Sequence, residues 1–89
     1  MPNKYSIKDY EARNLFVGMA KGVLEDFNGR FMLVSLIEEY HGIKDELSEE
    51  IYDILIKAKT IDLDNDPKEM ILSKVKQMYD SLKELDEEF

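Results

Sequence analysis

Few groups of residues in this sequence have types and spacings that suit a chemical task, and the most regular group is acidic. Asp62-Leu63-Asp64-Asn65-Asp66 places side-chain oxygens at alternate positions, as in the opening of a calcium-binding loop. The sixth position of such a loop requires glycine and the twelfth a glutamate, whereas this chain has Pro67 and Ser73 there. We therefore expect no metal site, and we expect these acids to cap the following helix and face solvent.

Residue types that carry most enzyme chemistry are scarce. The chain has one histidine, His41, and no cysteine, which excludes disulfides, thiolate nucleophiles and zinc sites of histidine and cysteine. His41 precedes a glycine at a predicted helix end, where a capping role is the simpler interpretation. No serine has a nucleophile-elbow context, and no glycine-rich phosphate loop occurs. Apart from a hydrolase with paired carboxylates, which stays open because acids are plentiful, we expect no catalytic residue, no cofactor and no enzyme.

Acidic residues instead concentrate in the middle of the chain. We expect one partner-binding set there, made of carboxylates and one aromatic ring: Glu38, Glu39, Asp45, Glu46, Glu49, Glu50, Tyr52 and Asp53. Carboxylates at the end of a helix oppose its dipole, and this cost is offset if they serve a positively charged partner. Tyr52 lies off the apolar stripe of its helix, so we expect an exposed ring that anchors a basic surface. A merely solvated polar face is the alternative.

Net charge limits the classes of partner. The 89 residues include 12 basic and 20 acidic side chains, a net charge of −8. Such a field repels phosphate backbones and anionic lipids, so we expect a basic protein partner, no direct nucleic-acid binding and no membrane binding. Acidity that serves solubility alone is the competing interpretation. Apolar runs are far shorter than the roughly 20 residues of a membrane span, and no apolar signal core is present, which predicts a cytoplasmic protein.

Hydrophobic periodicity predicts a compact, all-α, antiparallel four-helix bundle in a single domain over residues 1–89. The predicted helices span residues 7–27, 30–41, 48–60 and 67–86. Ser6, with Asp9 three residues later, and Ser48 are predicted N-caps. The segment Asp66-Pro67-Lys68-Glu69 predicts a capping box at the start of the last helix. Whether the last two helices are separate or one broken element is left open.

Two expectations concern how these helices pack. The second helix carries more apolar residues than one stripe needs, so we expect it to be the most buried. Gly18 and Gly22 lie inside the first helix, where each glycine costs about 1 kcal/mol relative to alanine at an exposed position. We expect a neighbouring helix to approach closely at these glycines, with a binding notch as the alternative.

Two short motifs, residues 5–11 near the start of the chain and residues 64–71 with 75–77 at the last predicted helix, resemble those of a known family, the colicin/pyocin nuclease immunity proteins. Residues 5–11, Tyr-Ser-Ile-Lys-Asp-Tyr-Glu, are similar to that family's Ser-Ile-Ser-Asp-Tyr-Thr-Glu opening. Residues 64–71 and 75–77 resemble the start of its last helix, an acidic Ser-Pro-Glu-Gly-Ile-Val pattern followed by lysines. In place of the family's Asp-Leu-Ile-Tyr-Tyr-Pro signature, residues 50–53 keep one tyrosine. The resemblance implies a distorted four-helix bundle that blocks a bacteriocin nuclease domain, with partner contacts at Glu38, Glu39 and Tyr52.

We therefore expect a small acidic inhibitor of a basic protein, in its most specific form a bacteriocin immunity protein that binds a nuclease domain. One alternative is a phage-encoded or regulatory antagonist whose carboxylates mimic DNA phosphates against another nucleic-acid-binding protein. A second is a structural module, in which the last helix pairs two copies into a homodimer. This alternative depends on apolar residues spaced by four and three, a bundle or coiled-coil seam made of Ile71, Val75, Met78, Leu82 and Leu85.

Overall fold

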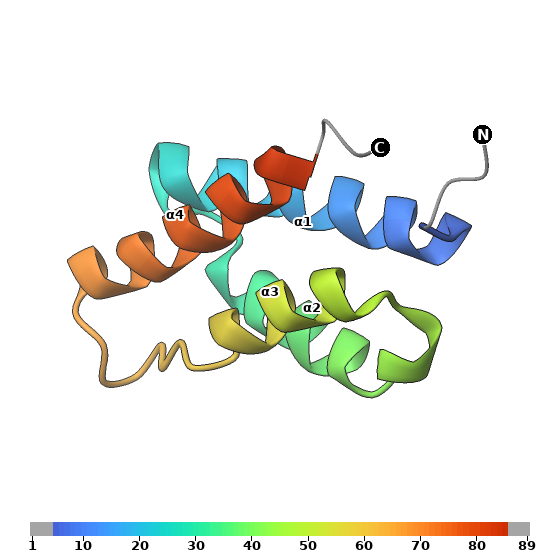
Figure 1. Cartoon of the computed structure of the whole chain (residues 1–89). Coiled ribbons are helices and arrows are strands. Elements are labelled where there is room, and N and C mark those ends of the chain that lie inside the picture. Colours follow the sequence, from blue (N-terminus) through green and yellow to red (C-terminus); the bar gives the residue numbers. More distant parts are fainter. Residues whose placement is uncertain (1–4, 86–89) are drawn as a thin grey trace.

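The computed structural model describes residues 5–85. Within these residues the chain forms four α-helices, one short 3-10 helix and no strand: α1 (Ile7–Asp26), α2 (Arg30–His41), η1 (Lys44–Glu46), α3 (Glu49–Ala58) and α4 (Lys68–Glu84). α1 and α4 pack side by side and run in opposite directions, while α2 and α3 pack against each other on one side of this pair (Figure 1). The expected all-α four-helix bundle is confirmed.

The observed helix bounds can be set beside those predicted from periodicity. α2 has the predicted bounds, and α1 ends one residue earlier than predicted. α3 covers residues 49–58 instead of 48–60, and α4 begins at residue 68 instead of 67. The predicted end of the last helix, residue 86, lies outside the described residues. A loop over residues 59–67 separates α3 from α4, so they are two elements.

Side-chain caps explain where α1 and α3 begin. The Ser6 hydroxyl accepts a hydrogen bond from the Asp9 amide at 3.2 Å, and the Asp9 carboxylate accepts one from the Ser6 amide at 2.9 Å, which completes a capping box. The Ser48 hydroxyl accepts from the Ile51 amide at 3.4 Å and caps α3. Both predicted N-caps are confirmed.

The capping box predicted for α4 is wrong. Pro67 itself occupies the N-cap position of α4, and no side chain caps this helix. The Asp66 carboxylate instead accepts hydrogen bonds from the Asp62 amide, at 2.9 Å, and from the Lys74 ammonium, at 3.0 Å. The ammonium of Lys74 and the amide of Asp62 therefore bind the carboxylate that was expected to cap α4. Sequence spacing does not show that these groups compete with the helix amides for Asp66.

The hydrophobic core lies between α1, α3 and α4, with a smaller contribution from α2. α1 buries Ala12, Phe16, Ala20 and Val23. The Phe16 ring meets Tyr40 of α2 edge-on, with the ring centroids 5.2 Å apart. α4 buries its predicted seam residues Ile71, Val75, Met78 and Leu82 in this core. Four of the five residues expected to pair two copies are thus buried within the chain, and the fifth, Leu85, is partly buried against the same core.

The expectation that α2 is the most buried helix is wrong. Only Leu33 and Ile37 of α2 are buried, whereas five residues of α1 and four of α4 are. Phe31 is 61 % exposed and Met32 is 63 % exposed. Neighbouring helices cover only the side of α2 that carries Leu33 and Ile37, so the additional apolar side chains of its first turn face solvent.

The close helix approach expected at Gly18 and Gly22 is also wrong. A Cβ atom added at Gly18 would meet nothing within 4 Å, and one at Gly22 would lie 3.9 Å from the backbone oxygen of Asn28, an ordinary contact. Packing among residues 5–85 therefore requires a glycine at neither position.

The turn from α1 to α2 has an unusual backbone. Phe27, the C-cap of α1, adopts a left-handed conformation with φ of 61°, and Gly29 has φ of 78°. Left-handed backbone is uncommon for a bulky residue. Phe27 packs against the core, and the cations of Arg30 and Lys68 lie 4.4 and 5.2 Å from its ring centroid. These cation–π contacts and the packing offset the backbone strain.

Candidate functional site

Seven of the eight predicted site residues are carboxylates on one continuous stretch, at the C-terminal end of α2, in η1 and at the start of α3. We call this set the acidic corner, and it comprises Glu38, Glu39, Asp45, Glu46, Glu49, Glu50 and Asp53. All seven residues are exposed. Residues 38–53 hold these seven acids and a single basic residue other than histidine, Lys44, and therefore carry six of the chain's eight net negative charges.

Helix geometry positions the corner's carboxylates differently on its two helices. Glu49 and Glu50 occupy the first turn of α3, where the helix dipole favours negative charge. Glu38 and Glu39 lie near the C-terminus of α2, where the dipole opposes it. Glu49 and Asp53 are one turn apart and share the face of α3 opposite the buried Ile51. Negative charge thus extends over both helices and the turn between them.

Basic side chains do not neutralise most of this charge. Within residues 5–85, no ion pair joins a lysine or arginine to Glu38, Glu39, Asp45, Glu46, Glu49 or Asp53. The ion pairs that join described residues to one another include Lys8 with Glu11, Lys21 with Glu25, Lys74 with Asp66 and Lys76 with Asp80. Carboxylates concentrated in one segment with few counter-ions raise the negative potential around it, which attracts a cationic surface.

Glu50 differs from the other acids because it also serves the fold. Its carboxylate accepts a hydrogen bond from the hydroxyl of Tyr5, a residue that is 5 % exposed. This contact ties the start of α3 to the residues that precede α1, across 45 positions of sequence. Glu50 is therefore a poor choice for testing binding, because its removal would also disturb packing.

The expectation of an exposed Tyr52 ring is wrong. Tyr52 is half-buried, its hydroxyl lies 2.8 Å from Nδ1 of His41, and the two rings stack with centroids 5.7 Å apart. His41, expected to cap α2, thus pairs with a side chain of α3. The amide of Gly42 closes the helix end instead, by donating to the carbonyls of Glu38 and Glu39. The pair holds α2 and α3 together beneath the carboxylates.

The sequence analysis identified Asp9 only as part of the local cap of α1, and it missed two features at this end of the molecule. Asp9, 2 % exposed, uses its second carboxylate oxygen to accept a hydrogen bond from the Ser48 amide at 2.7 Å, which fixes the start of α3 against α1. Ile7, which lies between Tyr5 and Asp9 in the chain, is 79 % exposed. The sequence signal for this exposure is that Ile7 is the first residue of α1. An exposed aliphatic side chain therefore lies at the same end as the acidic corner.

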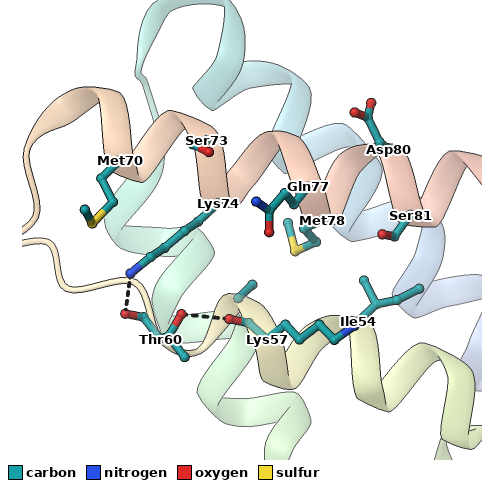
Figure 2. A pocket seen from close by; sticks show the side chains of 11 residues that line it. Ile54, Lys57, Thr60, Met70, Ser73, Lys74, Gln77, Met78, Asp80 and Ser81 are labelled. Carbon is teal, nitrogen blue, oxygen red and sulfur yellow. Dashed lines mark hydrogen bonds between the residues drawn. The ribbon is translucent and has the colours of Figure 1, made fainter.

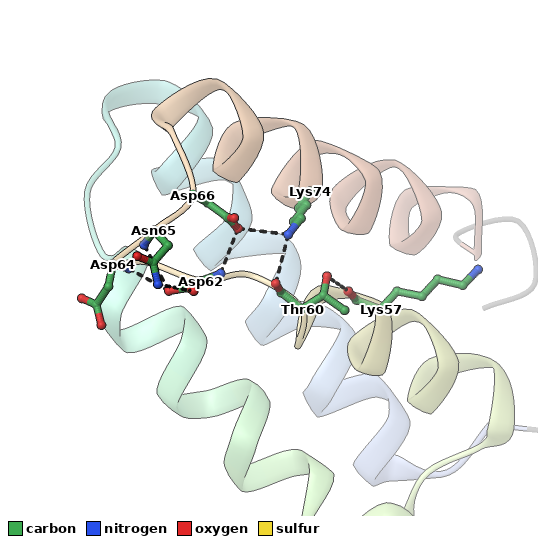
Figure 3. A network of polar contacts seen from close by, with 7 residues as sticks. All are labelled: Lys57, Thr60, Asp62, Asp64, Asn65, Asp66 and Lys74. Atoms are coloured by element: carbon green, nitrogen blue, oxygen red, sulfur yellow. Dashed lines mark hydrogen bonds and ion pairs between the residues drawn. The ribbon is translucent and has the colours of Figure 1, made fainter.

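In the acidic loop over residues 62–66, the carboxylates of Asp62 and Asp66 accept hydrogen bonds from within the loop, and Asp66 also pairs with Lys74 of α4 (Figure 3). The Asp62 carboxylate accepts hydrogen bonds from the amides of Asp64 and Asn65 and from the Asn65 side chain. The Asn65 side chain contributes most to holding the pKa of Asp62 below its ordinary value. The backbone amide of Asp62, followed by Lys74, lowers the pKa of Asp66. Within residues 5–85, no group of three or more His, Cys, Asp or Glu side chains is placed to hold a metal ion.

A groove of about 570 Å³ separates α3 from α4 (Figure 2). Ile54, Ala58 and Met78 contribute apolar surface to it, and Ser73, Gln77 and Ser81 follow one another at four-residue intervals along α4. No histidine lines this groove. Within residues 5–85, Lys74 pairs with Asp66 and Asp80 with Lys76, and no hydrogen bond joins either side chain to Ser73 or Ser81. Its residues therefore do not form a nucleophile with a general base.

In the described part of the chain, no helix is long and apolar enough to cross a membrane. Comparison with models of protein families, with curated proteins and with solved structures found no match to this chain. Its function must therefore be inferred from the arrangement of its own residues, of which the acidic corner is the most concentrated.

Proposed function

We propose that this protein is a small acidic inhibitor that binds a basic protein partner through the acidic corner, and that the partner is a nuclease domain of the bacteriocin type. One observation carries the proposal. Residues 38–53 carry a net charge of −6 out of the chain's −8, and Glu38, Glu39, Asp45, Glu46, Glu49 and Asp53 form no ion pair with a lysine or arginine of residues 5–85. Charge that served solubility alone would not need to be gathered in this way.

The physical basis of such inhibition is competition with phosphate. A nuclease binds its substrate with lysine and arginine side chains that contact the phosphate backbone. Clustered carboxylates attract the same side chains, steer the two proteins together and hinder access of DNA. These interactions weaken with salt, because exposed charges are screened over about 8 Å at physiological ionic strength.

The test compares two sets of four neutral substitutions. The corner variant carries Glu38→Gln, Glu39→Gln, Glu49→Gln and Asp53→Asn, and the control variant carries Glu25→Gln, Asp64→Asn, Glu69→Gln and Glu84→Gln. All eight positions are exposed, and both variants change the net charge equally. At about 0.5 kcal/mol for each exposed charge, the corner variant loses about 2 kcal/mol of binding free energy, roughly thirtyfold in affinity.

Binding to a purified bacteriocin nuclease domain is measured by isothermal titration at low and high salt, and inhibition by the rate of DNA cleavage. We expect the wild type and the control variant to bind and inhibit, and the corner variant to do neither efficiently. Equal inhibition by both variants, or tight binding that ignores salt, would refute the proposal. An equally basic DNA-binding protein without nuclease activity is the comparison partner, and preferential binding to it would favour the DNA-mimic alternative.

A further inference from the structure

The solvent-facing side of α2 joins exposed apolar residues to part of the acidic corner. Phe31, Met32, Ser35, Glu38 and Glu39 recur at the three- and four-residue spacing of one helix face. All five are exposed. We call this row the α2 strip. From Phe31 to Glu39 it extends roughly 12 Å along the helix, at 1.5 Å per residue.

The apolar half of the α2 strip is unusually exposed. Phe31 is 61 % exposed and Met32 is 63 % exposed, whereas Leu33 and Ile37 of the same helix are buried. The guanidinium of Arg30 lies 4.8 Å from the centroid of the Phe31 ring and limits its freedom, so the ring is held in place while most of it faces solvent. An aromatic ring already held in position loses little side-chain entropy when a partner covers it.

Charge changes sign along the α2 strip, so a bound partner segment has one favoured orientation. The cation of Arg30 lies at the apolar end, and Glu38 and Glu39 lie about two turns further on. No lysine or arginine pairs with these two carboxylates within residues 5–85. A partner segment must therefore place cations over Glu38 and Glu39 and keep them away from Arg30.

We propose that the α2 strip binds an amphipathic helix of the partner, with its apolar residues packed on Phe31 and Met32 and its lysines or arginines over Glu38 and Glu39. This inference rests on the proposed function, since it names the part of the basic partner that contacts α2. The carboxylates of the α2 strip require basic residues in one half of that partner helix, and the exposed apolar pair requires apolar residues in the other half. Helices that dock in this way present anchors at three- and four-residue spacing.

The probe is a fluorescently labelled synthetic peptide of about 14 residues, roughly four helical turns. Its first half carries leucines at three- and four-residue spacing, and its second half carries lysines on the same face. A peptide of the same composition in scrambled order is the control. Fluorescence anisotropy at low and physiological salt measures the affinity of the full chain for each peptide.

We expect the ordered peptide to bind the wild type at least tenfold more tightly than the scrambled one. Phe31→Ser with Met32→Ser should weaken binding at least tenfold without removing its salt dependence, because loss of two apolar anchors exceeds 1.4 kcal/mol. Glu38→Lys with Glu39→Lys should weaken it at least as much, mainly at low salt. The matched controls, Ile7→Ser and Met70→Ser for exposed apolar residues and Glu69→Lys with Glu84→Lys for charge, should change affinity less than twofold.

Several outcomes would overturn the inference. The inference fails if the two peptides bind with equal affinity or if the Phe31 and Met32 variant binds the ordered peptide as tightly as the wild type does. It also fails if the Ile7 or Met70 control weakens binding as much as that variant does. Sedimentation of the protein alone adds another: self-association that the Phe31 and Met32 substitutions abolish would mean that a second copy covers the α2 strip. If those substitutions leave inhibition of the nuclease intact while the corner variant loses it, the proposed function stands and the inference about the α2 strip fails.

Discussion

Replacing Asp9 with alanine tests the contact that positions the candidate site. Asp9 is 2 % exposed, and its two oxygens accept hydrogen bonds from the amides of Ser6, at 2.9 Å, and Ser48, at 2.7 Å. The substitution removes half of a capping box, which costs about 1 kcal/mol. It also leaves the amide of the half-buried Ser48 without its acceptor, which costs about 2 kcal/mol, within the range of about 1–3 kcal/mol for a donor shielded from water.

Together these effects give a loss of about 3 kcal/mol in the free energy of unfolding. For a chain of this size, that loss lowers Tm by roughly 12–24 °C. Urea and thermal unfolding, followed by far-UV circular dichroism, measure both quantities. Ser6→Ala removes only the local cap and should cost about 1 kcal/mol. Glu11→Ala removes an exposed carboxylate of the same helix and should change stability by no more than about 0.5 kcal/mol.

Hydrogen exchange separates the local cap from the link between helices. In Asp9→Ala the Ser48 amide should lose protection, whereas in Ser6→Ala it should keep it. If Asp9→Ala destabilises the protein no more than Ser6→Ala does, or if the Ser48 amide keeps its protection, the assignment of Asp9 as the link between α1 and α3 is wrong.

Two further predictions concern α1 and the 62–66 loop. Gly18→Ala should raise the free energy of unfolding by about 0.5–1 kcal/mol, because the added Cβ meets nothing within 4 Å; a lower urea midpoint would contradict this. Because contacts with the Asp62 amide and with Lys74 lower the pKa of Asp66 below the ordinary 3.8, its carboxylate stabilises the fold above that pH, and the benefit is lost as pH falls through the lower folded-state pKa. Asp66→Asn should therefore be less stable than the wild type near neutral pH, and the difference should disappear as pH falls through the lowered pKa of Asp66. pH-dependent unfolding measures this, and a difference that persists once Asp66 is protonated would contradict the assignment.

The features that could be predicted from the sequence depend on local interactions between residues close together in the chain. Helix bounds follow from the 3.6-residue period of apolar side chains and from caps such as Ser6 and Ser48, whose partners lie three residues away. The all-α class and the run of acids over residues 38–53 also required no knowledge of packing. Each of these features depends on neighbours within about one helical turn or on composition, which can be read directly from the chain.

Tertiary contacts decided how the candidate site is built. We expected Tyr52 to be an exposed anchor, but it pairs with His41. We expected Asp66 to cap α4, but its carboxylate binds Lys74. Phe31 belongs to the same apolar helix as the buried Leu33, and periodicity gave no means of telling which would face solvent. The physical reason is shared by all of these residues. A side chain's burial and hydrogen-bond partner depend on which helix packs beside it, and that neighbour lies many residues away in the sequence.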